Sequence, residues 1–164
     1  MPAEETSLYL KHRPNDWDGV LGQPAAVATL RTALEAGKLR RAIMLSGEPG
    51  TGKTTIARIL RRKLGCNPRD YSEVNCAGLK EPLDAIRRIQ QHMGLAPSAG
   101  KCRVWCLDEF QAMSRSTYAQ QAMLKTLEDT PRHCYFILCT TDPSKINKAI
   151  QTRCTLVRLS PLPV

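Results

Sequence analysis

Short apolar runs alternate with helix-forming segments along the whole chain. Five segments are short, rich in apolar or β-forming residues and bounded by turn residues, which predicts strands at 42–46, 71–75, 102–108, 134–140 and 154–159. Five further segments have the apolar spacing or the composition of helices, at 24–40, 56–65, 81–93, 116–129 and 144–150.

Two features of these segments predict a parallel sheet with helices on both faces. Strands that alternate with helices return through right-handed crossovers and lie parallel to their neighbours. The runs 42–46 and 134–140 are apolar almost throughout, as in strands that are buried on both faces. The pattern therefore predicts one α/β domain, and 164 residues with 42% hydrophobic content are enough for one well-buried core.

The composition excludes some classes of protein. No run of about 18 apolar residues is present, which excludes a transmembrane helix. Residues 1–14 contain acids and no apolar central region, so we expect a cytoplasmic protein that is not secreted. A net charge of +9 favours nucleic acid or an acidic partner surface, although a basic balance also serves solubility alone. The seven cysteines form no CxxC pair, which predicts reduced core thiols instead of zinc ligands.

A phosphate-binding loop is predicted at residues 47–55, GEPGTGKTT, which match the pattern G-x-x-x-x-G-K-[ST]. The loop follows a predicted strand and opens a predicted helix, where backbone N–H groups and the positive end of the helix meet a phosphate. A simple glycine-rich turn is the alternative, but this context favours phosphate binding. Lys53 is expected to contact the β- and γ-phosphates, and the Thr54 hydroxyl to bind Mg²⁺. The predicted nucleotide-binding residues of the loop are Gly47, Glu48, Pro49, Gly50, Thr51, Gly52, Lys53, Thr54 and Thr55.

Two adjacent carboxylates, Asp108 and Glu109, end the apolar strand that contains Trp105. Ligands of a parallel sheet bind beyond the carboxyl ends of its strands, so we expect these acids beside the phosphate loop. Asp108 would then hold Mg²⁺, and Glu109 would polarise the attacking water. The second acid favours an ATP-hydrolysing protein over a GTPase or a small-molecule kinase. The alternative for Glu109 is a solvated turn residue.

Six motifs, in their order along the chain, resemble the AAA+ ATPase subunits of DNA polymerase sliding-clamp loaders. They are YLKHRPNDWDGVLGQ, LSGEPGTGKTTIAR, VWCLDEFQAMS, AQQAMLKTLEDTP, FILCTTDPSKI and AIQTRC. The chain resembles the small subunits of replication factor C and the bacterial tau/gamma subunit over nearly all of residues 9–160. The resemblance implies a P-loop NTPase sandwich of three αβα layers with five parallel strands in the order 5-1-4-3-2. It also implies ATP and Mg²⁺ as cofactors and ATP hydrolysis as the activity.

The same resemblance implies roles for residues outside the phosphate loop. Thr141 stands at the sensor 1 position that reads the γ-phosphate, where Asn is commoner. Arg153 matches the arginine finger, which reaches the ATP of a neighbouring subunit in trans. Asn75 matches a switch residue that holds the catalytic glutamate inactive until DNA binds. The residues expected near the adenine are Arg13, Pro14, Val20 and Leu21.

Contact with DNA is a further implication of the resemblance. The residues on helices that face primer-template DNA in the family are Arg87, Arg88, Arg115 and Ser116. The alternative for these arginines is a solvated helix face. Gln120 matches a position that couples DNA binding to the ATP site, and helix filler is the alternative for it. Phe110 and Gln111 depart from the family after the two acids, and the sequence offers no physical account of them.

The family resemblance also predicts the organisation and the partners of the chain. We expect an N-terminal segment (1–23) with the adenine-side box and an AAA+ ATPase core (24–164), while the family's lid and collar domains are absent. Such a core is expected to bind ATP weakly and hydrolyse it slowly by itself. The expected partners at the replication fork are other clamp-loader subunits, a sliding clamp and primer-template DNA. The alternative functions are a non-hydrolysing structural subunit and another AAA+ DNA motor, such as a helicase loader or a branch-migration helicase.

Overall fold

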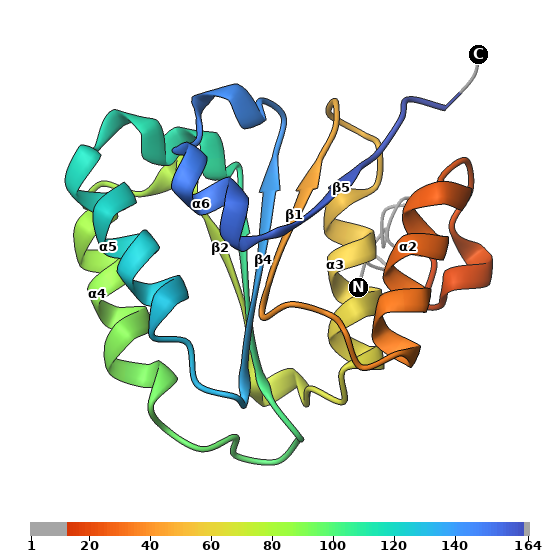
Figure 1. Cartoon of the computed structure of the whole chain (residues 1–164), viewed down its shortest axis with the longest axis horizontal. Coiled ribbons are helices and arrows are strands. Elements are labelled where there is room, and N and C mark those ends of the chain that lie inside the picture. Colours follow the sequence, from red (N-terminus) through yellow and green to blue (C-terminus); the bar gives the residue numbers. More distant parts are fainter. Residues whose placement is uncertain (1–12, 163–164) are drawn as a thin grey trace, which may run out of the picture.

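A five-stranded parallel sheet lies between two layers of helices in the computed structural model, which describes residues 13–162 (Figure 1). The strands are β1 (Ala42–Ser46), β2 (Tyr71–Asn75), β3 (Arg103–Asp108), β4 (Cys134–Thr140) and β5 (Thr155–Arg158). Their spatial order is β2-β3-β4-β1-β5, and every neighbouring pair is parallel. This order confirms the predicted fold. Because all the strands are parallel, their carboxyl ends lie at the same end of the sheet.

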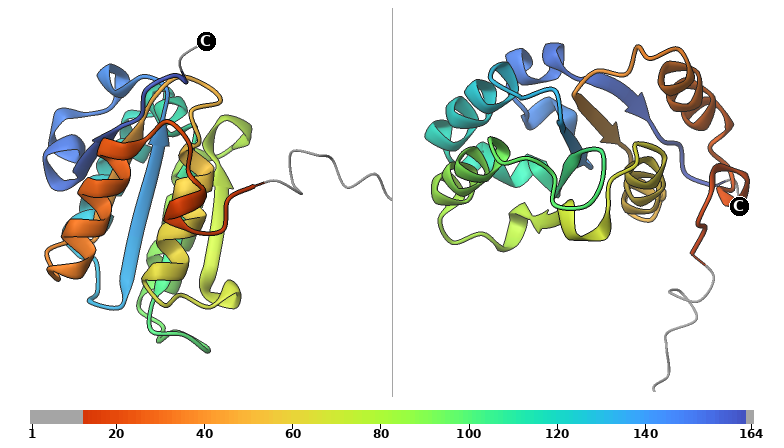
Figure 2. Two further views of the ribbon diagram at one scale, coloured as in Figure 1. Left: turned by 90° about the vertical axis from the view of Figure 1, so that its right-hand side faces the viewer. Right: turned by 90° about the horizontal axis from the view of Figure 1, so that it is seen from below.

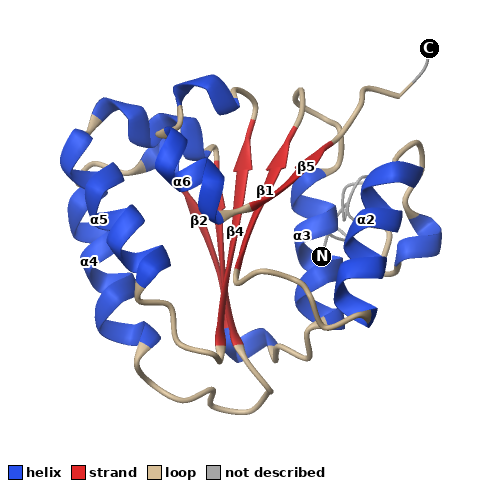
Figure 3. Cartoon of the chain, in the orientation of Figure 1, coloured by secondary structure: helices blue, strands red, loops and turns tan. Residues whose placement is uncertain are grey.

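The helices cover both faces of the sheet (Figure 3). On one face lie α2 (Pro24–Glu35) and α3 (Lys53–Lys63), and on the other lie α4 (Pro82–Met93), α5 (Thr117–Glu128) and α6 (Lys148–Arg153). Short 3₁₀ helices occupy the connections: η1 (Trp17–Gly19), η2 (Pro68–Asp70), η3 (Cys76–Gly78), η4 (Phe110–Arg115) and η5 (Pro143–Lys145). The view from below in Figure 2 shows the sheet between the two helical layers.

Successive residues of the central strands enter the two halves of the core. Ile43 and Leu45 of β1 pack beneath α2 and α3, while Met44 between them packs toward α4 and α5. In β3, Trp105 stacks on Phe136 of β4, with ring centroids 5.3 Å apart. The apolar runs of the sequence follow from this arrangement, because each side chain of a central strand is covered by a helix. The seven cysteines are free and buried, as predicted from their spacing.

Three predicted helices differ from the observed ones by more than one residue. The helix predicted at 24–40 ends at Glu35, and the one predicted at 56–65 begins earlier, at Lys53, directly after the glycine-rich loop. The prediction of a single helix at 144–150 is wrong, because η5 precedes a separate helix that begins at Lys148. The Asn147 side chain accepts a hydrogen bond from the backbone N–H of Ala149, and this cap starts the second helix.

A buried carboxylate fixes the long connection between α4 and β3. The Asp70 side chain accepts hydrogen bonds from the backbone N–H groups of Ser98, Ala99 and Gly100 and from the Ser98 hydroxyl. The Arg103 guanidinium lies 3.8 Å from the same carboxylate. Burial by itself raises the pKa of Asp70, but these hydrogen bonds outweigh it and lower the pKa to about 2.

The Asp70→Ala substitution is expected to lower the free energy of unfolding by about 3 kcal/mol, because three backbone N–H groups lose a charged acceptor. The lowered pKa means that the carboxylate stabilises the fold fully above its ordinary value of 3.8 and progressively less as the pH falls toward 2. Urea unfolding should therefore show a larger difference from wild type at pH 6 than at pH 3. Asp84→Ala, which removes an exposed ion pair of 3.8 Å, is the control. Equal effects of the two substitutions on the free energy of unfolding would contradict the role of Asp70 in fixing the connection between α4 and β3.

Candidate nucleotide-binding site

The predicted phosphate loop connects the end of β1 to the start of α3. Gly50 and Gly52 have φ angles of 80° and 95°, a left-handed conformation that glycine adopts without steric penalty. Gly47 starts the loop under the chain that leaves β5, where an added Cβ would lie 2.8 Å from the carbonyl oxygen of Leu159. The loop thus ends at the N-terminus of α3, where no side chain caps the helix, and N–H groups in this position can bind an anion.

Lys53 is buried in this loop, with 7% of its surface exposed. Its Nζ donates hydrogen bonds to the carbonyl oxygens of Gly47 at 2.7 Å and Glu48 at 2.9 Å. The Thr51 hydroxyl donates to the same Glu48 carbonyl at 2.8 Å. An ammonium group is therefore held at the centre of the loop, where a phosphate would meet it.

The two acids lie beside the loop, as predicted. The Thr54 hydroxyl donates a hydrogen bond to Oδ2 of Asp108 at 3.3 Å. These two hard oxygen donors fit Mg²⁺, which binds proteins through one or two carboxylates or hydroxyls and keeps several waters. A cavity of about 140 Å³ separates the loop from the acids, and it is lined by Pro49, Gly50, Gly52, Lys53, Thr54, Thr55, Asp108 and Glu109.

Glu109 turns the chain away from the sheet directly after the strand. Its φ angle of 51° lies in the left-handed region, which is uncommon for a residue other than glycine and is found at functional sites. Its backbone N–H donates to Oδ1 of Asp108 at 2.9 Å. Phe110 follows, and its side chain is 1% exposed in the core beneath α4 and α5. A large apolar side chain at this position therefore anchors the turn that carries Glu109.

A second cavity, of about 220 Å³, adjoins the first and shares Gly50, Gly52 and Thr55 with it. The remaining residues that line it are Pro14, Gly19, Val20, Leu21, Thr51 and Leu162. The structure thus brings three of the four residues predicted near the adenine beside the phosphate loop. Arg13, the fourth, is partly buried and is not among the residues that line the cavity.

Gln23 joins both ends of the chain to this cavity. Its Nε2 donates to the carbonyl oxygens of Ser160 at 2.6 Å and Thr51 at 3.2 Å, and its Oε1 accepts from the Ser160 N–H at 3.0 Å. Neither Gln23 nor Leu162 was predicted from the sequence, and Leu162 lies so close to Gly22 that a Cβ added to Gly22 would be 2.0 Å from it. Gly22 lies within the motif 9–23, and its φ of 73° is a left-handed conformation that favours glycine.

Thr141 lies immediately after β4, at the same carboxyl end of the sheet as the acids. The neighbouring Thr140 is fully buried, and its hydroxyl donates to Oε1 of Gln111 at 3.0 Å. The Thr141 N–H points at the same oxygen at 3.4 Å. Gln111 in turn donates from Nε2 to Oε2 of Glu109 at 2.5 Å. The predicted sensor segment is therefore connected to the second acid through Gln111, for which the sequence offered no physical account.

Asn75 ends β2 beside Asp108 of β3. Its Oδ1 accepts a hydrogen bond from the Ala77 N–H at 3.1 Å and caps η3. Within residues 13–162, no hydrogen bond joins Asn75 to Glu109. The predicted switch residue thus has a local structural role in this conformation.

Arg153 lies near the amino ends of the strands, at the opposite end of the sheet from the phosphate loop. It ends α6 just before β5, forms an ion pair with Glu128, and lines a cavity of about 540 Å³ with Arg40 and Arg41. That cavity reaches Ala42, the first residue of β1, whereas the phosphate loop follows the last residue of β1, about 16 Å away. Arg153 therefore lies far from the phosphate loop of its own chain.

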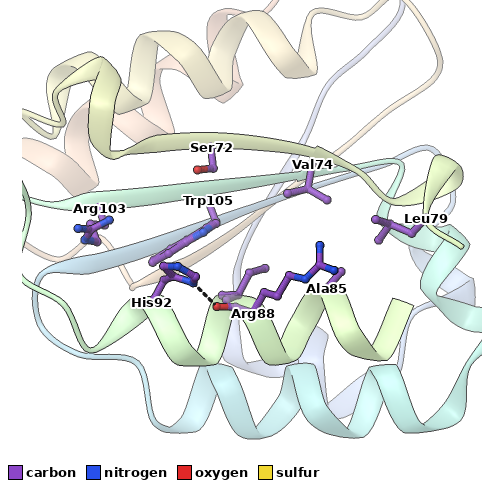
Figure 4. A pocket seen from close by; sticks show the side chains of 9 residues that line it. Ser72, Val74, Leu79, Ala85, Arg88, His92, Arg103 and Trp105 are labelled. Carbon is purple, nitrogen blue, oxygen red and sulfur yellow. Dashed lines mark hydrogen bonds between the residues drawn. The ribbon is translucent and has the colours of Figure 1, made fainter. Parts of the chain in front are cut away.

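The residues predicted to contact DNA have different surroundings. Arg87 is exposed on α4, and Arg88 extends beside a pocket of about 350 Å³ between α4 and the edge of the sheet (Figure 4). Arg115 donates from Nη2 to the carbonyl oxygens of Cys76 and Leu79, which ties η4 to η3. The Ser116 hydroxyl caps α5 by accepting from the Ala119 N–H at 3.1 Å. The last two residues therefore have structural roles of their own.

Three features define a P-loop nucleoside triphosphatase of the α/β class: the strand β1, the glycine-rich loop with Lys53 and Thr54, and the two acids at the end of β3. The sequence pattern of the AAA family, the ATPase family associated with various cellular activities, matches residues 43–162. The chain therefore belongs to the AAA family. Membership supports ATPase activity in general and implies nucleotide binding, usually with Mg²⁺.

The most similar relatives include tau and gamma subunits of bacterial DNA polymerase III. The chain is 36% identical over 168 residues to the tau subunit of Bacillus subtilis, which covers 90% of this chain and 30% of that protein. It is 33% identical over 174 residues to the gamma subunit of Buchnera aphidicola subsp. Schizaphis graminum, which covers 93% of this chain and 47% of that protein. The chain thus spans less than half the length of these relatives. The likeness confirms the predicted similarity to the tau/gamma subunits over most of this chain.

Solved structures confirm the fold. A DNA polymerase III gamma subunit-related protein from Thermotoga maritima superposes with a TM-score of 0.67 at 19% identity, over 82% of this chain and 46% of that one. The RuvB Holliday junction branch migration motor of the same organism gives a TM-score of 0.69 at 24% identity, over 91% of this chain and 48% of that one. Within the described residues, no helix is long and apolar enough to cross a membrane.

Proposed function

We propose that this chain is the ATPase core of a clamp-loader subunit, which uses Mg²⁺-dependent ATP hydrolysis to load a sliding clamp onto primer-template DNA in the cytoplasm. The observation that carries the proposal is the site in which Lys53, Thr54, Asp108 and Glu109 surround one cavity. The similarity to tau and gamma subunits supports clamp loading over the other AAA functions. The alternative of a branch-migration motor is supported by fold alone.

The residues that line the cavity have different roles in hydrolysis. The N–H groups of the loop and the Lys53 ammonium bind the β- and γ-phosphates, so Lys53 exchanges the carbonyl oxygens of Gly47 and Glu48 for phosphate oxygens. Thr54 and Asp108 would hold Mg²⁺, which would supply positive charge to the phosphate oxygens. Glu109 accepts a proton from the attacking water, and Thr141 senses the γ-phosphate.

The adjoining cavity holds the adenine in this proposal. Its walls are largely apolar, and Gln23 fixes them to the phosphate loop through Thr51 and Ser160. Residues 1–23 form the adenine-side segment and residues 24–164 the ATPase core. Residues 1–12 of that segment lie outside the described residues.

Neighbouring subunits complete the site in trans. Arg153 lies too far from its own phosphate loop to contact the nucleotide bound there, and its side chain is 42% exposed at the molecular surface. A guanidinium from a neighbour neutralises charge on the transferred phosphoryl group. Turnover by the chain alone is therefore slow. Asn75 holds Glu109 inactive until DNA binds. The DNA phosphates are contacted by Arg87, Arg88, Arg115 and Ser116.

The test is the ATPase rate of the chain assembled with its partner subunits, with and without primer-template DNA and a sliding clamp. We expect DNA and clamp together to stimulate the rate more than either alone, and Arg153→Ala to remove most of that stimulation. Arg69→Ala, at an exposed residue of η2, is the control. Strand separation stimulated by DNA without the clamp would favour a branch-migration motor, and an assembly that loads clamps while this chain hydrolyses no ATP would favour a structural subunit.

A further inference from the structure

The side-chain amide of Gln111 joins Glu109 to the end of β4. Nε2 of Gln111 lies 2.5 Å from Oε2 of Glu109, and Oε1 of Gln111 lies 3.0 Å from the Thr140 hydroxyl and 3.4 Å from the Thr141 nitrogen. One amide thus contacts the proposed general base on one side and the proposed sensor segment on the other.

The partners of Gln111 fix the orientation of its amide. A carboxylate only accepts hydrogen bonds, so Glu109 requires the Nε2 end. The Thr141 N–H only donates, so it requires the Oε1 end. Reversing the amide would place two acceptors together and two donors together. The arrangement is therefore determined by chemistry at both ends.

The far end of this link is rigid. Thr140 is fully buried, its hydroxyl also accepts from the Asp142 N–H at 3.1 Å, and its carbonyl accepts from the Gly47 N–H at 3.1 Å. Thr140 thus contacts the first residue of the phosphate loop directly and Glu109 through Gln111. The Glu109 backbone, with its φ of 51°, has left the sheet, so its side chain needs an anchor beyond the strand.

We propose that Gln111 is a positioning residue that holds the Glu109 carboxylate for attack and links its position to the Thr140–Thr141 segment. The link occupies Oε2 and leaves Oε1 available to accept a proton from water. Glu109 lines the phosphate cavity in the same conformation in which it bonds to Gln111, so the bond is compatible with a position beside the phosphates. The inference rests on the proposed function, since it assumes that Glu109 activates water.

The first test compares ATP turnover and ATP affinity in Gln111 variants of the full chain. Gln111→Leu removes the link and keeps the approximate volume, so we expect kcat to fall about tenfold to a hundredfold while ATP affinity changes less than about twofold. Gln111→His should restore much of kcat, because a neutral imidazole donates with one nitrogen and accepts with the other. The matched control is Gln121→Leu, at an exposed position of α5. An unchanged or raised kcat in Gln111→Leu would overturn the positioning role, and the unchanged ATP affinity shows that the variant is folded.

A second readout does not depend on turnover. The side-chain amide protons of Gln111, assigned by NMR through their loss in Gln111→Leu, should shift in both Glu109→Ala and Thr140→Val and stay unchanged in Gln121→Leu. If the resonances shift in both variants while the wild-type chain hydrolyses no ATP, the link stands and the proposed function is refuted. Resonances that respond to neither Glu109→Ala nor Thr140→Val would refute the link itself.

Discussion

Lys53→Ala is expected to weaken ATP binding by at least about a hundredfold and to abolish turnover. The ammonium is buried within the loop and donates to two loop carbonyls, so its removal takes away the only side-chain cation that lines the phosphate cavity of the described chain. Loss of two charge-assisted hydrogen bonds to phosphate corresponds to about 3 kcal/mol. Binding is measured by titration calorimetry with ATP and Mg²⁺.

The control for this substitution is Lys63→Ala at the other end of the same helix. Lys63 lies 3.0 Å from Asp16 in an exposed ion pair, so its loss should leave ATP affinity within about twofold of wild type. Full ATP turnover in Lys53→Ala would show that Lys53 of the phosphate loop is not needed for hydrolysis.

Glu109→Gln is expected to bind ATP as wild type does and to hydrolyse it about a hundredfold to ten-thousandfold more slowly. The amide keeps the size of the carboxylate, and its oxygen still accepts from Gln111, but it cannot take a proton from water. The slow step is therefore hydrolysis of bound ATP, which single-turnover phosphate release measures directly.

Glu35→Gln at the exposed end of α2 makes the same chemical change away from the site and should leave the rate unchanged. Equal rates for Glu109→Gln and wild type would assign water activation to another group.

Local patterns in the sequence were sufficient to predict the sheet and the phosphate side of the site. The strand predictions at 42–46 and 134–140 match β1 and β4, because a buried parallel strand is apolar along its whole length. Lys53 and Asp108 were predicted from motifs whose residues are close in the chain. The sequence predicted one helix across Ile146, where the structure has a break between η5 and α6. Asn147 caps α6 only because η5 has already ended before it, and the sequence does not show where η5 ends.

The rest of the site depends on contacts between distant segments. Gln23 and Ser160 are 137 residues apart in the sequence, and neither has a local pattern that indicates their hydrogen bonds. Phe110 and Gln111 were departures without explanation because their partners, the core beneath α4 and the end of β4, become neighbours only in the fold. The structure gives each of them a role in holding Glu109.

Single-turnover phosphate release from ATP by the wild-type chain, with Mg²⁺ and with EDTA, tests the central claim most directly. A magnesium-dependent ATPase at this loop should release phosphate slowly with Mg²⁺, and the release should disappear in EDTA and in Lys53→Ala. Release that persists equally in EDTA or in Lys53→Ala would contradict the account.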